Sequence, residues 1–122
     1  MKDTDKTIIA VDRCVYIEPG KGKNERKLEI LVSQETKNMA MAQIIKGIIT
    51  DYGRDLEVSK DISSYTYRST SSFEPEIYAH LDCDTIDNEA SKKFLLSMYD
   101  IKMAKYVFNE IDKMSKDSTS AK

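Results

Sequence analysis

Aromatic and basic side chains gather in the middle of the sequence, at spacings suited to holding a planar ligand. Tyr65 and Tyr67 share one face of a predicted strand, Arg68 adjoins them, and Phe73 and Tyr78 follow. Aromatic rings stack on nucleobases, and the Arg guanidinium makes cation–π and bidentate phosphate contacts. Tyr and Thr are also good strand formers, so β-propensity alone accounts for the same residues. The functional interpretation is a site for a nucleotide-like ligand.

A second candidate constellation places an imidazole and carboxylates on one strand face. His80, Asp82 and Asp84 alternate along the chain, with about 6.6 Å between successive members of such a face. These groups can hold a divalent cation and activate water, and the Glu-x-Lys triplets over 25–27 and 35–37 suit a metal-dependent nuclease. The alternative is a solvated strand face that leads into a helix cap. His80 is the sole histidine, and no residue is marked as an activated nucleophile, so we expect no enzymatic activity, metal or cofactor.

The composition excludes several classes of protein. The 122 residues suit one domain over 1–114, followed by a polar tail over 115–122. With 40% hydrophobic and 33% charged residues, the chain is too apolar for general disorder. The 19 basic and 21 acidic residues give a net charge of −2, which argues against binding long nucleic acids. No apolar run approaches the roughly 18 residues of a membrane span.

The N-terminus and the cysteines bear on compartment and source. The first residues lack the apolar core of a signal peptide, so we expect a cytoplasmic protein. Cys14 and Cys83 lie in predicted strands, where cysteine commonly serves as a small hydrophobe rather than as half of a disulfide. Lys greatly outnumbers Arg, as in proteins of AT-rich genomes, which suggests a bacterium or a phage.

Hydropathy patterning predicts two strand pairs and two helices. Alternation favours strands over 7–18 and 26–33, and again over 63–68 and 77–84. Apolar residues at helical spacing predict a helix that begins after Ser33 or Thr36 and ends at Gly53. Residues 55–62 have the composition of a polar connection. A final helix is expected over 87–114, with apolar residues on two of its sides.

The expected final helix is long for so small a domain. At 1.5 Å per residue it would measure about 42 Å, whereas a compact domain of this length is roughly 35 Å across. The overhang, apolar on two sides, would need a partner, and a symmetric dimer is the common solution.

The order of hairpin, helix, strand pair and long helix resembles the phage anti-Thoeris proteins of the first type. The resemblance covers most of the chain as a layout, without a diagnostic motif. It matches Phe73 or Tyr78 as an aromatic near the last strand, Asn88 at the start of the long helix, and Lys105 along it. If that family prefers Arg at the last position, Lys105 is a departure, because Lys lacks the guanidinium fork. The resemblance implies a small oligomeric protein that binds cyclic ADP-ribose-type signals without cleaving them.

We therefore expect an α+β domain in which a small antiparallel sheet of two strand pairs packs with two helices, the long C-terminal helix forming an oligomer interface. The leading function is non-catalytic capture of a small nucleotide-type immune signal by a protein encoded by a phage or mobile element. The alternatives are a protein-binding inhibitor or immunity-type protein, which would use the aromatic surface as a hot spot, and the nuclease. The predicted ligand-binding residues are aromatic, basic or, in one case, an amide: Tyr65, Tyr67, Arg68, Phe73, Tyr78, Asn88, Arg54 and Lys105.

Overall fold

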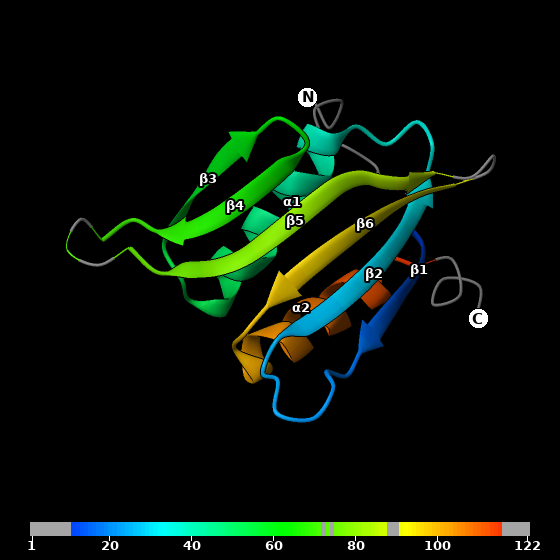
Figure 1. Cartoon of the computed structure of the whole chain (residues 1–122). Coiled ribbons are helices and arrows are strands. Elements are labelled where there is room, and N and C mark those ends of the chain that lie inside the picture. The colour runs from blue at the N-terminus through cyan, green and yellow to red at the C-terminus, as the bar shows by residue number, and fades with distance from the viewer. Residues whose placement is uncertain (1–10, 72, 74, 88–90, 116–122) are drawn as a thin grey trace.

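The computed structural model describes residues 11–71, 73, 75–87 and 91–115. Across these ranges the chain forms six strands and two helices (Figure 1). In chain order they are β1 (Val11–Ile17), β2 (Arg26–Ser33), α1 (Asn38–Tyr52), β3 (Leu56–Asp61), β4 (Ser64–Ser69), β5 (Ile77–Asp87), β6 (Ser91–Met98) and α2 (Ile101–Asp112).

The strands form one sheet in the order β1-β2-β6-β5-β4-β3, and all neighbours are antiparallel. The hairpin of β1 and β2 joins the four-strand meander of β3 to β6 through the pairing of β2 with β6, in which Leu28 lies opposite Leu96. The expected α+β class is confirmed, and the sheet is larger than the two strand pairs expected from the sequence.

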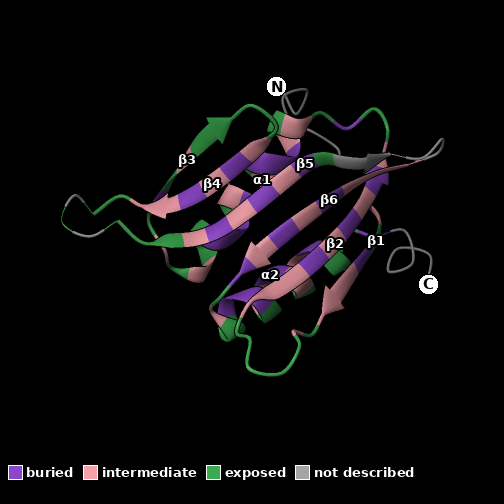
Figure 2. Cartoon of the chain, in the orientation of Figure 1, coloured by how far each residue is buried: buried purple, intermediate pink, exposed green. Residues whose placement is uncertain are grey.

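Both helices pack on the same face of the sheet, and no helix of the described residues covers the opposite, open face (Figure 1). The helix α2 contacts β1, β2 and β6, and α1 contacts β3 and β5. Alternate residues along β2, β4, β5 and β6 are buried beneath the helices, as the banding in Figure 2 shows. Neither helix in the described ranges has the length and apolar character needed to cross a membrane.

Local signals explain where the helices begin and end. Gly53 has φ 114° at the C-terminus of α1, a left-handed conformation that favours glycine, and its N–H donates to Thr50. Asp100 caps α2, since its carboxylate accepts a hydrogen bond of 3.0 Å from the Met103 N–H.

The expectation of one helix over 87–114 is wrong, because the described part of this region contains β6, a two-residue connection and α2. The twelve residues of α2 span about 18 Å, so the overhang that motivated a dimer does not exist. Residues 55–62, expected to be a polar connection, form the edge strand β3 and its turn. The tail over 116–122 lies outside the described residues.

The two cysteines are buried and carry free thiols. Burial raises the pKa of Cys14 to about 12, and the nearby Asp112 carboxylate adds to the rise. Burial likewise raises the pKa of Cys83 to about 11, with Asp84 and Asp82 adding to it. Both cysteines therefore act as small apolar groups of the core.

Candidate functional site

Tyr65 and Tyr67, which we predicted to stack on a ligand, instead lie in the core. Their exposed fractions are 1% and 0%, because alternation along β4 points both rings toward the helices. The Tyr67 hydroxyl donates a hydrogen bond of 3.0 Å to the Ala42 carbonyl of α1. Burial raises the pKa of both phenols. In this fold these residues serve packing, and neither ring is available to a ligand.

Simple alternation along β5 would place Tyr78 on the same face as His80, but a bulge changes its position. Tyr67 lies opposite Ala79 and Arg68 lies opposite Ile77, so Tyr78 is an extra residue in β5. Its ring packs against the core and lies 5.7 Å from the Arg54 guanidinium.

Arg54, which follows α1, is held by three neighbours. The centre of its guanidinium lies 5.4 Å from the Tyr52 ring as well as over Tyr78, and its Nη2 lies 3.2 Å from the Asp100 carboxylate. Arg54 and Tyr78 are the predicted ligand-binding residues that the described structure brings together.

The other predicted residues lie apart from that pair. Arg68 is half-buried on β4, Phe73 is 94% exposed in the loop between β4 and β5, and Lys105 is exposed on α2. Asn88 lies outside the described residues. The residues of the predicted site therefore lie in several separate parts of the molecule.

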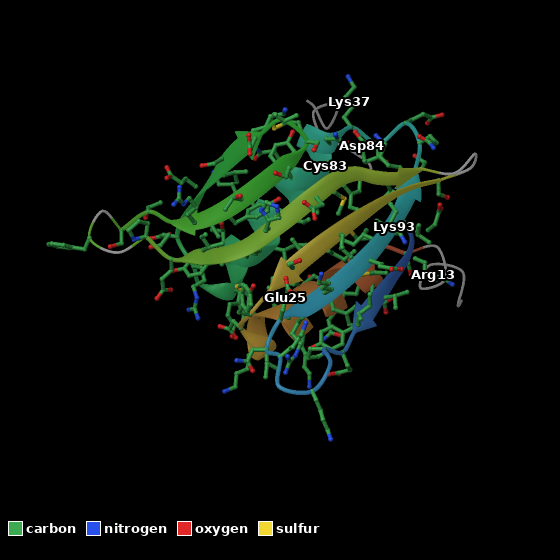
Figure 3. All side chains as sticks on the ribbon, in the orientation of Figure 1. Arg13, Glu25, Lys37, Cys83, Asp84 and Lys93 are labelled. Carbon is green, nitrogen blue, oxygen red and sulfur yellow. The ribbon has the colours of Figure 1, made fainter. Side chains whose placement is uncertain are left out.

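The helix-free face of the sheet contains a groove of about 410 Å³. Glu25, labelled in Figure 3, comes directly before β2 at one side of it. The groove combines charged, hydroxyl and apolar side chains from β2, β4, β5 and β6 and the residues beside them. Its lining residues are Glu25, Lys27, Thr66, Ile77, Ala79, His80, Asp82, Ser97 and Tyr99.

A second cavity, of about 370 Å³, continues from this groove at the end of the sheet. Ile77 and Tyr99 line both, and the second cavity adds Arg54, Tyr78 and Asp100, among others. The two shared side chains are unusually open for their size, since Ile77 is 54% exposed and Tyr99 is 60% exposed. They form an apolar wall between two polar hollows. Tyr99 was not predicted as a binding residue, because it lies within the long helix expected over 87–114.

A continuous hydrogen-bonded array crosses the floor of the groove. The Thr66 hydroxyl lies 3.0 Å from His80 Nδ1, and His80 Nε2 lies 3.1 Å from Asp82 Oδ1. Thr66 lies directly opposite His80 in the β4–β5 pairing, and Asp82 follows two residues later on the same face of β5. Both ring nitrogens of the sole histidine are thus engaged by protein groups.

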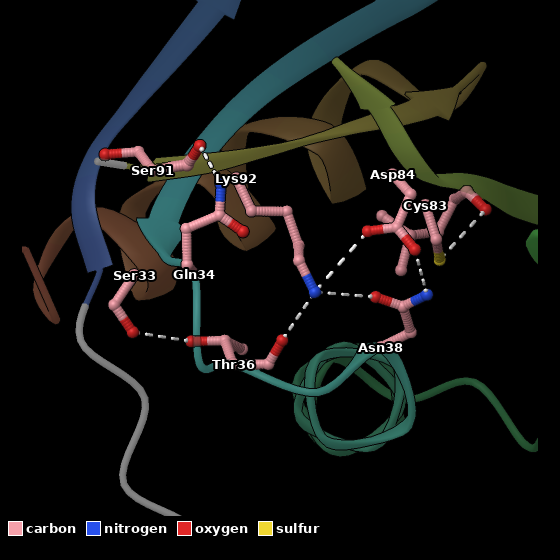
Figure 4. Close-up of polar contacts among 9 residues, drawn as sticks. Ser33, Gln34, Thr36, Asn38, Cys83, Asp84, Ser91 and Lys92 are labelled. Atoms are coloured by element: carbon pink, nitrogen blue, oxygen red, sulfur yellow. Dashed lines mark hydrogen bonds and ion pairs between the residues drawn. The ribbon is translucent and has the colours of Figure 1, made fainter. Parts of the chain in front are cut away.

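Asp84 does not join His80 and Asp82, because β5 bulges again between Asp82 and Ile86. With φ 59°, Asp84 turns toward the start of α1 (Figure 4). Its carboxylate accepts a hydrogen bond of 2.8 Å from Asn38 and lies 3.4 Å from Lys92 Nζ. The Asn38 hydrogen bond and Lys92 lower its pKa against an opposing effect of burial. Lys92 also donates to the Thr36 carbonyl at 2.9 Å. This cluster fastens β5 and β6 to α1.

The separation of Asp84 removes the third member of the metal site that the nuclease alternative requires. Among the described residues, no three His, Cys, Asp or Glu side chains are placed to hold a metal ion together. Glu25 and Lys27, from one of the two Glu-x-Lys triplets, line the same groove as His80 and Asp82, and the ammonium of Lys27 lies 3.9 Å from the carboxylate of Glu25. The nuclease hypothesis therefore has no metal centre in the described structure.

The chain matches no protein-family model, and no curated protein and no solved structure matches it either.

Proposed function

We propose that this chain is a non-catalytic binding protein that captures a small nucleotide-type ligand in the groove on the open face of the sheet. The resemblance to anti-Thoeris proteins implies the same role, but the residues that we propose for binding are those of the groove instead of those predicted from the sequence. The observation that carries the proposal is the exposed wall of Tyr99 and Ile77 beside the hydrogen-bonding floor of Thr66 and His80.

The groove offers each kind of contact that a nucleoside needs. The Tyr99 ring and the Ile77 side chain can cover the two-sided apolar surface of a base, as stacking platforms do in nucleotide-binding proteins. Thr66, His80 and Ser97 supply hydrogen-bonding groups for the base edge or the ribose. Lys27 supplies a cation at the rim for one phosphate group.

The charges of the groove limit the ligand to low net charge. Glu25 and Asp82 oppose the single ammonium of Lys27. In the adjoining cavity, Glu76 and Asp100 oppose Arg54. Because carboxylates outnumber cations in both, a polyphosphate would be repelled much more strongly than a singly charged cyclic nucleotide, and a neutral nucleoside would not be repelled.

Binding without turnover fits the surroundings of the array better than acyl transfer. An acyl-transfer site needs backbone N–H groups aimed at the developing oxyanion. Here β4 is paired with β3 and β5, and β5 with β4 and β6, so the backbone beside Thr66 and His80 is committed to the sheet.

Calorimetry with adenosine cyclic monophosphate tests the proposal. Stacking is worth roughly 1–3 kcal/mol per base, so Tyr99→Ala should weaken binding by about one to two decades. Tyr99→Phe retains the ring and should bind nearly as the parent does. Met39→Ala, a change at a 49% exposed apolar residue of α1, is the matched control and should bind normally. Equal binding by Tyr99→Ala and the parent would contradict the proposal.

A protein-binding role is the second candidate, favoured by one observation. The Phe73 ring is 94% exposed in the β4–β5 loop, and large exposed aromatic side chains are common anchors of protein interfaces. Native mass spectrometry of protein purified from its host separates the two roles, because a bound small molecule supports the first and a bound protein supports the second.

A further inference from the structure

We infer that the Thr66–His80–Asp82 array makes the groove selective for a base with an amino group over the same base with an oxo group. The inference rests on the proposed function and specifies its ligand. It follows from the order in which the three side chains are joined, at 3.0 and 3.1 Å, and from what each can donate.

Asp82 fixes where the histidine proton lies. An ionised carboxylate can only accept hydrogen bonds, and Asp82 Oδ1 lies 3.1 Å from His80 Nε2. In the neutral ring one nitrogen carries the proton and the other has a lone pair. The hydrogen bond to Asp82 therefore assigns the proton to Nε2 and leaves Nδ1 as an acceptor.

The histidine in turn fixes the Thr66 hydroxyl. Because Nδ1 can only accept, the hydroxyl 3.0 Å away must donate its single proton to it. Thr66 lines the groove, so what its oxygen offers to a ligand is a pair of acceptor sites. The hydroxyl, which could otherwise rotate to donate or accept, is held as an acceptor.

The acceptors gathered here match an amino group. Thr66 Oγ1 and the Asp82 carboxylate both line the groove, and both accept. An amino group on a base carries two N–H donors and no competing acceptor, whereas an oxo group at the same position presents lone pairs to these oxygens. Once the ligand covers the groove, a mismatch of that kind leaves polar groups unpaired, so it penalises the oxo base beyond the loss of one hydrogen bond.

Three nucleotides that differ in the group at purine C6, the oxo base also carrying an N1–H in place of an N1 lone pair, test the inference at slightly alkaline pH, where an ordinary histidine is neutral. They are adenosine cyclic monophosphate, its inosine analogue with an oxo group, and the analogue with unsubstituted purine. We expect the amino compound to bind about three- to tenfold more tightly than the unsubstituted one, and the oxo compound to bind most weakly. Equal binding of all three overturns the inference alone, and binding of none overturns the proposed function with it.

Variants separate the array from general effects on the groove. Thr66→Val has nearly the shape of threonine without its hydroxyl, so it should bring the amino-to-oxo preference close to one. Asp82→Asn should also reduce the preference, because its amide can donate to Nε2 and release the proton to Nδ1. Met39→Ala, at an exposed residue of α1 outside the groove, should leave the preference unchanged. An unchanged preference in Thr66→Val overturns the inference.

Nitrogen NMR of the sole histidine gives a readout that needs no ligand. The parent should show a protonated Nε2 and a bare Nδ1, and Asp82→Asn should increase the share of the other tautomer. A parent protein with its proton on Nδ1 overturns the inference whatever the affinities are.

Discussion

The two faces of the sheet carry different kinds of side chain: one face forms the core and the other lines the groove. The covered face consists of apolar residues that are almost completely buried beneath α1 and α2, such as Leu28, Leu81 and Leu96. The open face alternates with it along the same strands and carries Thr66, His80 and Asp82. Both faces belong to the same strands and have the same backbone geometry. The helices that cover one face therefore decide which residues form the core and which are accessible to a ligand.

Residue type alone therefore does not assign a side chain to a site. Tyr65 and Tyr99 are the same amino acid in the same sheet or directly beside it, yet their exposed fractions are 1% and 60%. The first contributes to folding and the second is available for binding. Variants on the covered face should therefore lose more stability than variants on the open face.

Truncation of the core tyrosines should have the largest effect. Tyr67→Ala and Tyr65→Ala should each lower the free energy of unfolding by about 3–5 kcal/mol, the range for large aromatic residues in cores. Tyr67→Phe keeps the ring, loses only the hydrogen bond to Ala42, and should cost about 1 kcal/mol. Urea denaturation measures all three. A near-normal stability of Tyr67→Ala would place its ring outside the core.

Two adjacent leucines of β6 provide the closest comparison between the faces. Leu96 is fully buried and Leu95 is half-buried on the open face. We expect Leu96→Ala to cost about 2–5 kcal/mol and Leu95→Ala about 1 kcal/mol, because less apolar area is lost from burial. Thermal or urea unfolding of both variants gives the ratio. Similar losses would mean that something also covers the open face.

The pH dependence of stability should show that Asp84 belongs to the cluster at α1. Its pKa is lowered in the fold, so its contribution is present above its ordinary value of 3.8 and is lost as pH falls through the lowered one. Asp84→Asn should therefore be slightly less stable than the parent at pH 6, and the gap should narrow toward pH 3. Because the side chain is 41% exposed, solvent screening keeps the effect small. A gap that does not change with pH would contradict the assignment.

The strands with clean alternation could be predicted from the sequence, and two others could not. In β2, Leu28, Ile30 and Val32 alternate with polar residues or Leu31, so the covered face is apparent. In β6 the run of Phe94, Leu95 and Leu96 hides the period of two, because the open face there carries a leucine. The Lys and Met residues around this run favour a helix, so the helix predicted over 87–114 included both β6 and α2. The clearest missed signal is the Asp100 cap.

The candidate site was predictable only in part, because bulges are not visible in a periodic pattern. His80 and Asp82 were recognised as a pair on one face, and the fold keeps them together. Tyr78 and Asp84 were assigned to the same face by simple alternation, and one bulge displaces each of them. Thr66 joins the site through pairing between strands, which no local pattern reveals.

The alkylation rates of the two buried thiols measure how often the fold opens locally around each of them. Alkylating reagents attack the thiolate, so a raised pKa and burial together make both cysteines slow to react while the fold is closed. Cys14 lies near Asp112 of α2, and Cys83 lies near Asp84 and Lys92, which join β5 and β6 to the start of α1. The labelling rate of Cys14 therefore reports how often β1 separates from α2, and that of Cys83 reports how often β5 separates from α1.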